Sequence, residues 1–227
     1  MISAFKNSEF QHSFLNSVVT ASISTAIILL LGVPFAYVMA RVQFPGKGFL
    51  DNLIDLPILI PQSVAGVALL VLLGPKSPVG EFMYKNCRLA IANGYLGIIA
   101  SQIFVSSPFL IRSAINAFAG VQRKLEDTSR TLGASAWSTF RRVSLPLASG
   151  GIFYGCILAL ARSLSEVGSL MVIAYHPMTA SVFLYDEFIQ YGLSETQPLA
   201  VLLLINCLWI FIALRWFKQQ ALRRYSL

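Results

Sequence analysis

Long charge-free stretches of mostly apolar residues alternate with short charged segments along the chain. A helix needs about 20 apolar residues to cross a hydrocarbon core of about 30 Å, and five stretches meet that need. We expect transmembrane helices at about 13–40, 53–73, 89–117, 147–173 and 196–217. The pattern therefore predicts an all-α membrane protein with five main spans in a single domain that covers residues 1–227.

Two of these spans carry residues that should disturb a straight helix. Asp55, Pro57 and Pro61 lie near the start of the second span, and a proline inside a helix removes a backbone donor. We therefore expect this span to be bent or partly unwound where it begins. The fourth span contains Arg162 and Glu166, and we expect both to lie within one long helix over 147–173. Between the fourth and fifth spans, residues 175–195 are expected to form a short external helix.

Composition excludes most soluble protein classes. Only 27 of the 227 residues are Asp, Glu, Lys or Arg, about half the usual charged fraction, so the charges cannot cover a water-soluble surface. The net charge of +7 could indicate nucleic-acid binding in a soluble protein. Here the basic residues gather at the ends of apolar stretches, so we interpret them as topology signals and expect no nucleic-acid partner.

The distribution of basic residues predicts the orientation, because cytoplasmic loops keep an excess of Lys and Arg. Twelve of the 17 basic residues fall in three segments: Arg41 and Lys47; Arg112, Arg123, Lys124, Arg130, Arg141 and Arg142; and Arg215, Lys218, Arg223 and Arg224. The opposite side holds Lys6, Lys76, Lys85 and Arg88. This places the N-terminus outside and the C-terminus inside. Met1–Gln11 lacks a basic region before a short apolar core, so we do not expect a cleaved signal peptide.

The segment 119–146 is too charged to cross a bilayer, yet its apolar residues recur at helical spacing. It predicts two short helices, with Gly133 just past the end of the first and Ser135 capping the second. Trp137 and Phe140 share one face of the second helix, away from Arg141. Two interpretations fit: a projecting knob that docks into a soluble partner, or a helix that lies flat on the inner leaflet.

The same segment resembles the EAA loop of the inner-membrane permeases of binding-protein-dependent ABC importers. That loop has EAA, a glycine after three residues, and an I-x-L-P end after nine more. Here the three places hold Asp127-Thr128-Ser129, Gly133, and Val143-Ser144-Leu145-Pro146. Asp127 replaces the family's Glu, Thr128 and Ser129 replace its two alanines, and Glu126 lies just before. The resemblance implies the importer permease fold, and we name residues 119–146 the coupling segment.

Further stretches are similar to the branch that transports molybdate, tungstate and sulfate. They are 44–47 (Phe-Pro-Gly-Lys), 55–57, 60–66, 130–133, 161–162 and 165–168. Many members of that branch have six spans, and the first has no counterpart here. Either the protein has five spans or the chain begins late.

The resemblance implies a set of partners and a place for this chain in the inner membrane. Such permeases work in pairs, here as a homodimer, with two ABC ATPase subunits and an external substrate-binding protein. The sequence has no G-x-x-x-x-G-K-[ST] motif, so we expect ATP and magnesium on the separate ATPase and no cofactor on this chain. By the motif match we assign ATPase coupling to Glu126, Asp127, Arg130, Gly133, Ala134 and Trp137.

The translocation pathway or gate is assigned from polar residues within the spans. Our candidates are Gln62, Ser63, Ser106, Arg162 and Glu166. Ionisable residues at membrane depth are functional candidates by default, but Arg162 and Glu166 also fit a structural ion pair. Serine and glutamine in spans often form hydrogen bonds between helices instead. Gly151, Gly155 and Ala159 recur every four residues, and we interpret them as a packing stripe.

Other chemistry finds little support in the sequence. His12 and His176 have no partner at a metal-ligand spacing, and the three cysteines are far apart, so we expect no metal site. An intramembrane enzyme would need a nucleophile with a base, and we find no catalytic residues. A secondary transporter is normally built from two repeated halves, and this sequence shows no evident repeat. The resemblance to the importer permeases implies import of an oxyanion, with molybdate or tungstate favoured over sulfate; amino acids or phosphate stay open.

Overall fold

The structure, a computed structural model, describes residues 8–223, and all regular structure in that range is helical. The helices are α2 (Ser8–Arg41), α3 (Lys47–Leu59), α4 (Gln62–Leu73), α5 (Pro78–Cys87), α6 (Tyr95–Ala119), α7 (Arg123–Thr131), α8 (Ala136–Thr139), the π-helix η1 (Phe140–Ser144), α9 (Leu145–Leu164), α10 (Leu170–Ile173), α11 (Ala180–Tyr191) and α12 (Leu193–Arg223). Lys6 and Arg224, which contribute to the charge asymmetry, lie outside the described residues.

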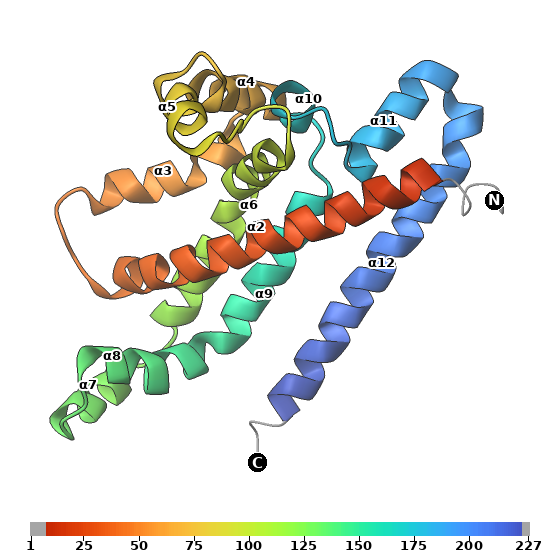
Figure 1. Cartoon of the computed structure of the whole chain (residues 1–227). Helices are drawn as coiled ribbons and strands as arrows, with labels where there is room; N and C mark the ends of the chain where they lie inside the picture. The colour runs from red at the N-terminus through yellow and green to blue at the C-terminus, as the bar shows by residue number, and fades with distance from the viewer. Residues whose placement is uncertain (1–7, 224–227) are drawn as a thin grey trace.

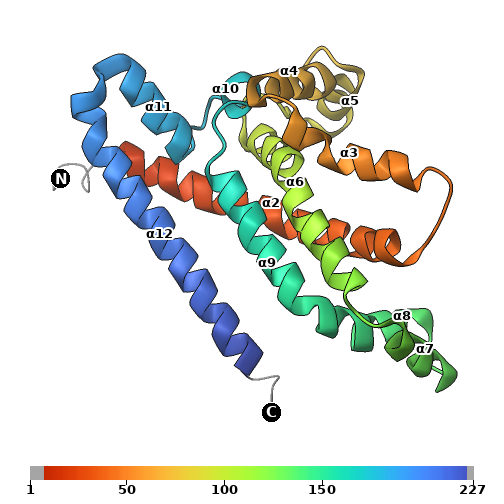
Figure 2. The same cartoon turned by 180° about the vertical axis from the view of Figure 1, so that it is seen from behind.

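Four helical segments are long and apolar enough to cross a membrane. They are α2, α6, α12 and the continuous run from α8 through η1 to α9; the bent pair α3–α4 is a fifth candidate. The structure therefore confirms the all-helical class and supports four to five spans. The α7–α8 end of the molecule lies at the same end as the C-terminal part of α12, whereas α4, α5, α10 and α11 gather at the other end (Figures 1 and 2).

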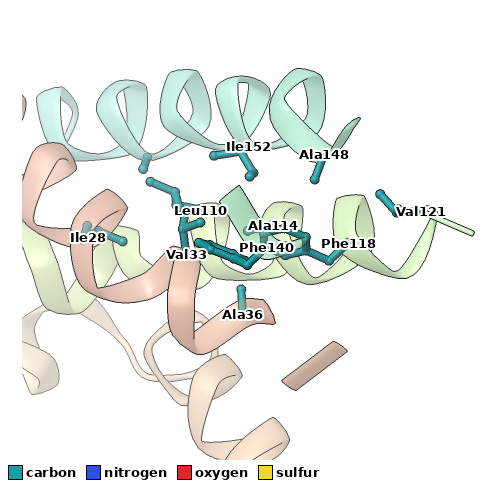
Figure 3. Close-up of a cluster of buried hydrophobic side chains, with 11 residues drawn as sticks. Ile28, Val33, Ala36, Leu110, Ala114, Phe118, Val121, Phe140, Ala148 and Ile152 are labelled. Atoms are coloured by element: carbon teal, nitrogen blue, oxygen red, sulfur yellow. The ribbon is translucent and has the colours of Figure 1, made fainter. Parts of the chain in front are cut away.

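The core of the molecule is formed by α2, α6 and α9, which pack side by side (Figure 1). Apolar side chains from all three helices meet there, among them Ile28, Leu110, Phe118 and Ile152, as Figure 3 shows. Association of helices in lipid depends on close van der Waals packing rather than on a hydrophobic driving force. Buried side chains that interlock across three helices supply that packing.

Small residues let α9 approach α6 closely. A Cβ atom on Gly151 would lie 2.6 Å from Ala117 Cβ, and one on Gly155 would lie 2.7 Å from Ser113 Cβ. Ala159, the third member of the stripe, is fully buried. The predicted packing role of this stripe is confirmed.

The predicted bend in the second span is confirmed and is sharp. The axes of α3 and α4 differ by 116° across Ile60 and Pro61. A proline disfavours the helical conformation of the residue before it, and Ile60 is extended, with φ −80° and ψ 131°. The chain therefore leaves α3 and restarts as a separate helix in a new direction.

The expectation of one helix over 147–173 is wrong. The helix α9 ends at Leu164, and only the short α10 follows after five intervening residues. The cause is Glu166, whose carboxylate accepts hydrogen bonds from the Ser169 amide at 3.0 Å and the Ser169 hydroxyl at 2.6 Å. A side chain that satisfies a nearby backbone donor competes with continued helix, and here it closes a turn.

The other helix ends differ less from the prediction. The third span was expected to start at residue 89, but α6 starts at Tyr95. Asn93 before it has a left-handed φ of 58°, and Gly94 is extended, so the helix cannot extend backwards. A helix is expected within 175–195, and α11 confirms it; its external placement stays a prediction.

Candidate functional site

The coupling segment folds as the two short helices that its sequence predicts. The first, α7, ends before Gly133, which has a left-handed φ of 88°. The Gly133 amide donates to the Arg130 carbonyl at 2.9 Å, a bond typical of a helix end. The Ser135 hydroxyl caps α8 by accepting from the Ser138 amide at 3.2 Å. Both local predictions are confirmed.

Apolar side chains project from this segment without cover in the described chain. Leu132 is 84% exposed and Trp137 is 67% exposed, although the Trp137 ring stacks on Phe140. A hollow of about 650 Å³ lies between α7, α8 and the start of α9, with Leu125, Leu132 and Leu147 among its walls. An exposed apolar patch of this kind marks a contact with a protein or a membrane.

Glu126 lies inside the protein rather than on this surface. Both Nε and an Nη of Arg41 donate to Glu126 Oε1, at 3.0 and 2.9 Å, and the Ser144 hydroxyl donates to the same oxygen at 2.7 Å. The side chains of Arg41 and Glu126 are 10% and 7% exposed. A buried charge needs a partner and satisfied hydrogen bonds, and this carboxylate has both.

The coupling segment joins α9 through the π-helix η1. The Leu145 amide donates to the Phe140 carbonyl, five residues back, instead of four. Pro146 explains the change, because a proline has no amide hydrogen to complete the α-helical bond with the Arg142 carbonyl. π turns of this kind often occur at functional sites.

A seam of buried polar side chains crosses the interior between α2, α6 and α9. The Ser24 hydroxyl donates to Gln102 Oε1 at 3.0 Å, and Gln102 Nε2 donates to the Ser163 carbonyl at 3.3 Å. The Ser163 hydroxyl donates to Ser106 Oγ at 3.0 Å. Each of these side chains is buried, so the seam bonds helix to helix and lines no open channel within one chain.

A second polar group forms where α9 ends. Arg162 and Glu166 form an ion pair at 2.6 Å, with the Glu166 side chain fully buried. Ser169, which donates to Glu166, is also hydrogen-bonded to Ser101 of α6. The predicted pairing of the two charges is confirmed, and it fixes the 165–169 turn against α6.

The same turn packs against the start of α4. A Cβ atom on Gly66 would lie 2.8 Å from the Ser169 carbonyl oxygen, and one on Gly168 would lie 2.7 Å from Gln62 Cβ. The two glycines therefore allow backbones from two distant parts of the sequence to touch. Gln62 and Ser63 stay exposed beside this contact.

Residues 32–224 match the protein family described as "Binding-protein-dependent transport system inner membrane component". That range covers most of the chain. The chain belongs to this family. It is therefore a multi-pass protein of the inner membrane, as the sequence predicts.

Individual relatives of this permease agree with the family match. It is 46% identical over 204 residues to the molybdate/tungstate transport system permease protein of Pyrococcus furiosus. The aligned region covers 90% of this chain and 76% of that protein. It is 30% identical over 211 residues to the probable sulfate transport system permease protein of Chlorokybus atmophyticus, over 91% of this chain and 73% of that protein. A bacterial ABC transporter that imports alginate has a similar fold, with a TM-score of 0.74 at 17% identity, over 96% of this chain and 82% of that one.

The six coupling candidates of the permease divide into a surface group and one interior residue. Asp127, Arg130, Gly133 and Trp137 are exposed and Ala134 is half-buried. Glu126 is the interior residue. Five of the six candidates are thus at least partly accessible on the coupling segment.

The five pathway candidates divide in a similar way. Gln62 and Ser63 are exposed, and Arg162 is partly exposed. Ser106 and Glu166 are fully buried and bonded within the chain. Their geometry corresponds to the structural alternative that the sequence left open, in which Ser106 bonds helices together and Glu166 stabilises a turn.

Sequence reasoning missed a third charged cluster. Arg112 of α6 donates to both carboxylate oxygens of Asp55, at 2.7 and 2.6 Å, and to Asp51 Oδ1 at 2.8 Å. The cluster fastens α3 to α6. In the sequence, Arg112 stands out only as a topology signal. No spacing rule links it to carboxylates about 60 residues earlier in the chain. Within residues 8–223, His, Cys, Asp and Glu side chains form no group of three that could hold a metal.

Proposed function

We propose that this permease is the membrane subunit of an ATP-driven importer that moves molybdate or tungstate into the cytoplasm. The observation that carries the proposal is the high identity to the Pyrococcus furiosus molybdate/tungstate permease over nine-tenths of the chain. An external binding protein delivers the oxyanion, and two ATPase subunits supply the energy. The N-terminus lies outside and the C-terminus inside.

Docking of the ATPase falls to the exposed face of the coupling segment. Leu132 and Trp137 supply the apolar anchors, and exposed aromatic and apolar anchors dominate the energy of many protein interfaces. Asp127 and Arg130, both exposed on α7, supply charges at the rim. This arrangement favours a docked protein over the inner leaflet as the partner of this surface.

The oxyanion pathway lies between two copies of the chain. The polar groups inside one copy are already bonded to each other, whereas Gln62 and Ser63 face outwards at the start of α4. A second copy related by a two-fold axis would face the same residues across a shared space. Arg162, near the end of α9, is partly exposed, and its charge is paired with that of Glu166.

Sulfate is the second candidate substrate, because a sulfate permease also matches most of the chain. Molybdate, tungstate and sulfate are tetrahedral dianions, so similar polar groups would serve each of them. The higher identity to the molybdate/tungstate relative favours those two.

The proposal is tested by uptake into sealed vesicles that hold this permease together with the ATPase and the binding protein of the same transporter. We expect ATP-dependent uptake of molybdate or tungstate that requires all three components and exceeds uptake of sulfate. Preferential sulfate uptake would replace the substrate, and uptake driven by an ion gradient without ATP would contradict the importer.

A further inference from the structure

One carboxylate ties together three elements that reach the base of the coupling segment separately. Glu126 belongs to α7, Arg41 is the last residue of α2, and Ser144 ends η1 just before α9. All three hydrogen bonds converge on a single oxygen, Glu126 Oε1. Arg41 also donates to the Val121 carbonyl at 2.9 Å, which adds the chain after α6 to the same joint.

The joint lies directly behind the proposed docking surface. Asp127 follows Glu126 on α7 and is exposed. Two neighbouring residues of one short helix therefore face different sides, Asp127 the proposed partner and Glu126 the interior. Beside the joint, the Tyr37 ring contacts Phe118 and Phe140 edge-on, with ring centroids 5.2 and 4.9 Å apart. A push on α7 therefore reaches α2 and α9 through fixed contacts rather than through a loop.

Stability alone does not explain a buried ion pair at this place. Replacing such a pair by well-packed apolar residues is often neutral or stabilising, because burying two charges is costly. The pair instead fixes geometry. The planar Arg41 guanidinium donates through two nitrogens to one acceptor, so it sets the placement of α2 relative to α7. Apolar contacts would let the helices slide.

We propose that Glu126 is a positioning residue that holds the coupling segment in register with α2 and α9, so that movement of the docked ATPase becomes movement of the spans. The role rests on the proposed function as an importer permease. It differs from docking, because Glu126 is buried and does not reach the partner. Loss of the joint should therefore uncouple ATP hydrolysis from transport and leave ATPase binding intact.

The test compares wild-type permease with Glu126→Gln, each reconstituted in sealed vesicles with the ATPase and the binding protein. Glutamine keeps the size of the side chain and removes the charge. We expect the ATPase to copurify as before and ATP hydrolysis to continue, while uptake per ATP hydrolysed falls about tenfold, within the usual range of coupling between sites. The matched control is Glu81→Gln, which breaks the exposed Glu81–Lys85 pair and should leave the ratio unchanged.

Further variants separate positioning from folding. Combining Arg41→Gln with Glu126→Gln should lower the ratio by less than the two single changes multiplied together, since both changes remove the Arg41–Glu126 pair. Ser144→Ala removes only the third hydrogen bond and should give a smaller fall in the ratio. It decides the question if Glu126→Gln fails to assemble.

The outcomes are distinguishable. A reduced uptake-to-hydrolysis ratio with a bound ATPase supports the positioning role. An unchanged ratio in Glu126→Gln, or in Ser144→Ala if only that variant assembles, overturns it and leaves a structural ion pair. Absence of uptake in the wild-type complex would instead overturn the proposed function.

Discussion

Gly133 shows how one backbone conformation shapes the proposed docking surface. Its φ of 88° would strain any residue with a Cβ, and Gly46 has the same φ. No neighbouring atom lies within 4 Å of a Cβ added at either position. We expect Gly133→Ala and Gly46→Ala to lose similar stability, about 1 kcal/mol each. Only Gly133→Ala should weaken ATPase copurification, because only it changes the coupling segment. Equal copurification in both variants would contradict the docking assignment.

Glu187 of α11 predicts a pH dependence at the end of the molecule opposite the coupling segment (Figure 1). Burial raises the pKa of the Glu187 carboxyl above its usual 4.5, and the negative charges of Asp186, Glu9 and Glu195 raise it further. The folded protein then binds this proton more tightly than the unfolded chain does, so its stability falls as pH rises from 4.5 through the raised pKa. Glu187→Gln should therefore raise the Tm in detergent at neutral pH and flatten this part of the pH profile.

The control for that measurement is Glu81 on α5. Its pKa is lowered by the hydrogen bond and the charge of Lys85, so its ionised form stabilises the protein above its usual pKa and that contribution is lost as pH falls. Glu81→Gln should lower the Tm slightly at neutral pH. A Tm change of the same sign in both variants would contradict the electrostatic explanation.

Residue-level prediction succeeded where the cause was local. The Gly133 turn and the Ser135 cap depend on neighbours within four residues, and both could be read from the sequence. The environment of Glu126 could not, because burial of its side chain depends on Arg41, 85 positions away in the sequence. Long-range pairing of charges leaves no spacing signal in a single sequence.

Among the elements, the contact between α4 and the 165–169 turn depends on the absence of a side chain. A Cβ on Gly66 would lie within 3 Å of two backbone atoms of Ser169, which cannot move like the end of a flexible side chain. We expect Gly66→Ala to cost about 1–3 kcal/mol, the usual range for overpacking, measured as a lower Tm in detergent. Gly150→Ala is the control, since Gly150 lies in α9 with open space around it. That change should be neutral or stabilising by about 0.5–1 kcal/mol, and a loss as large as that of Gly66→Ala would contradict the argument.

The same elements show what sequence patterns can and cannot predict. Pro61 predicts the break between α3 and α4, because a proline restricts its own backbone and that of the residue before it. The end of α9 was missed, because Arg162 and Glu166 stand four residues apart, the spacing of an ion pair within a helix. Glu166 does pair with Arg162, but it also accepts from Ser169 and ends the helix instead of continuing it.

For the whole molecule, the charge asymmetry predicts which end faces the cytoplasm. In a background with Cys87, Cys156 and Cys207 replaced by serine, Lys85→Cys on α5 and Thr131→Cys on α7 give one exposed thiol at each end. In right-side-out vesicles a membrane-impermeant maleimide should label Lys85→Cys at once and Thr131→Cys only after the vesicles are opened, because basic loops stay inside. The reverse pattern would invert the proposed topology.

The five-residue π turn before Pro146 also bears on how such permeases can be recombined. Each residue of an α-helix advances the chain by about 100° around its axis, so a turn widened by one residue offsets everything on one side of it by that angle. The number of residues between Gly133 and Pro146 therefore sets the direction in which Leu132 and Trp137 point, relative to the face of α9 that meets α6. A chimera that takes this stretch from a relative should therefore keep its length, because adding or deleting a single residue would turn Leu132 and Trp137 relative to α9.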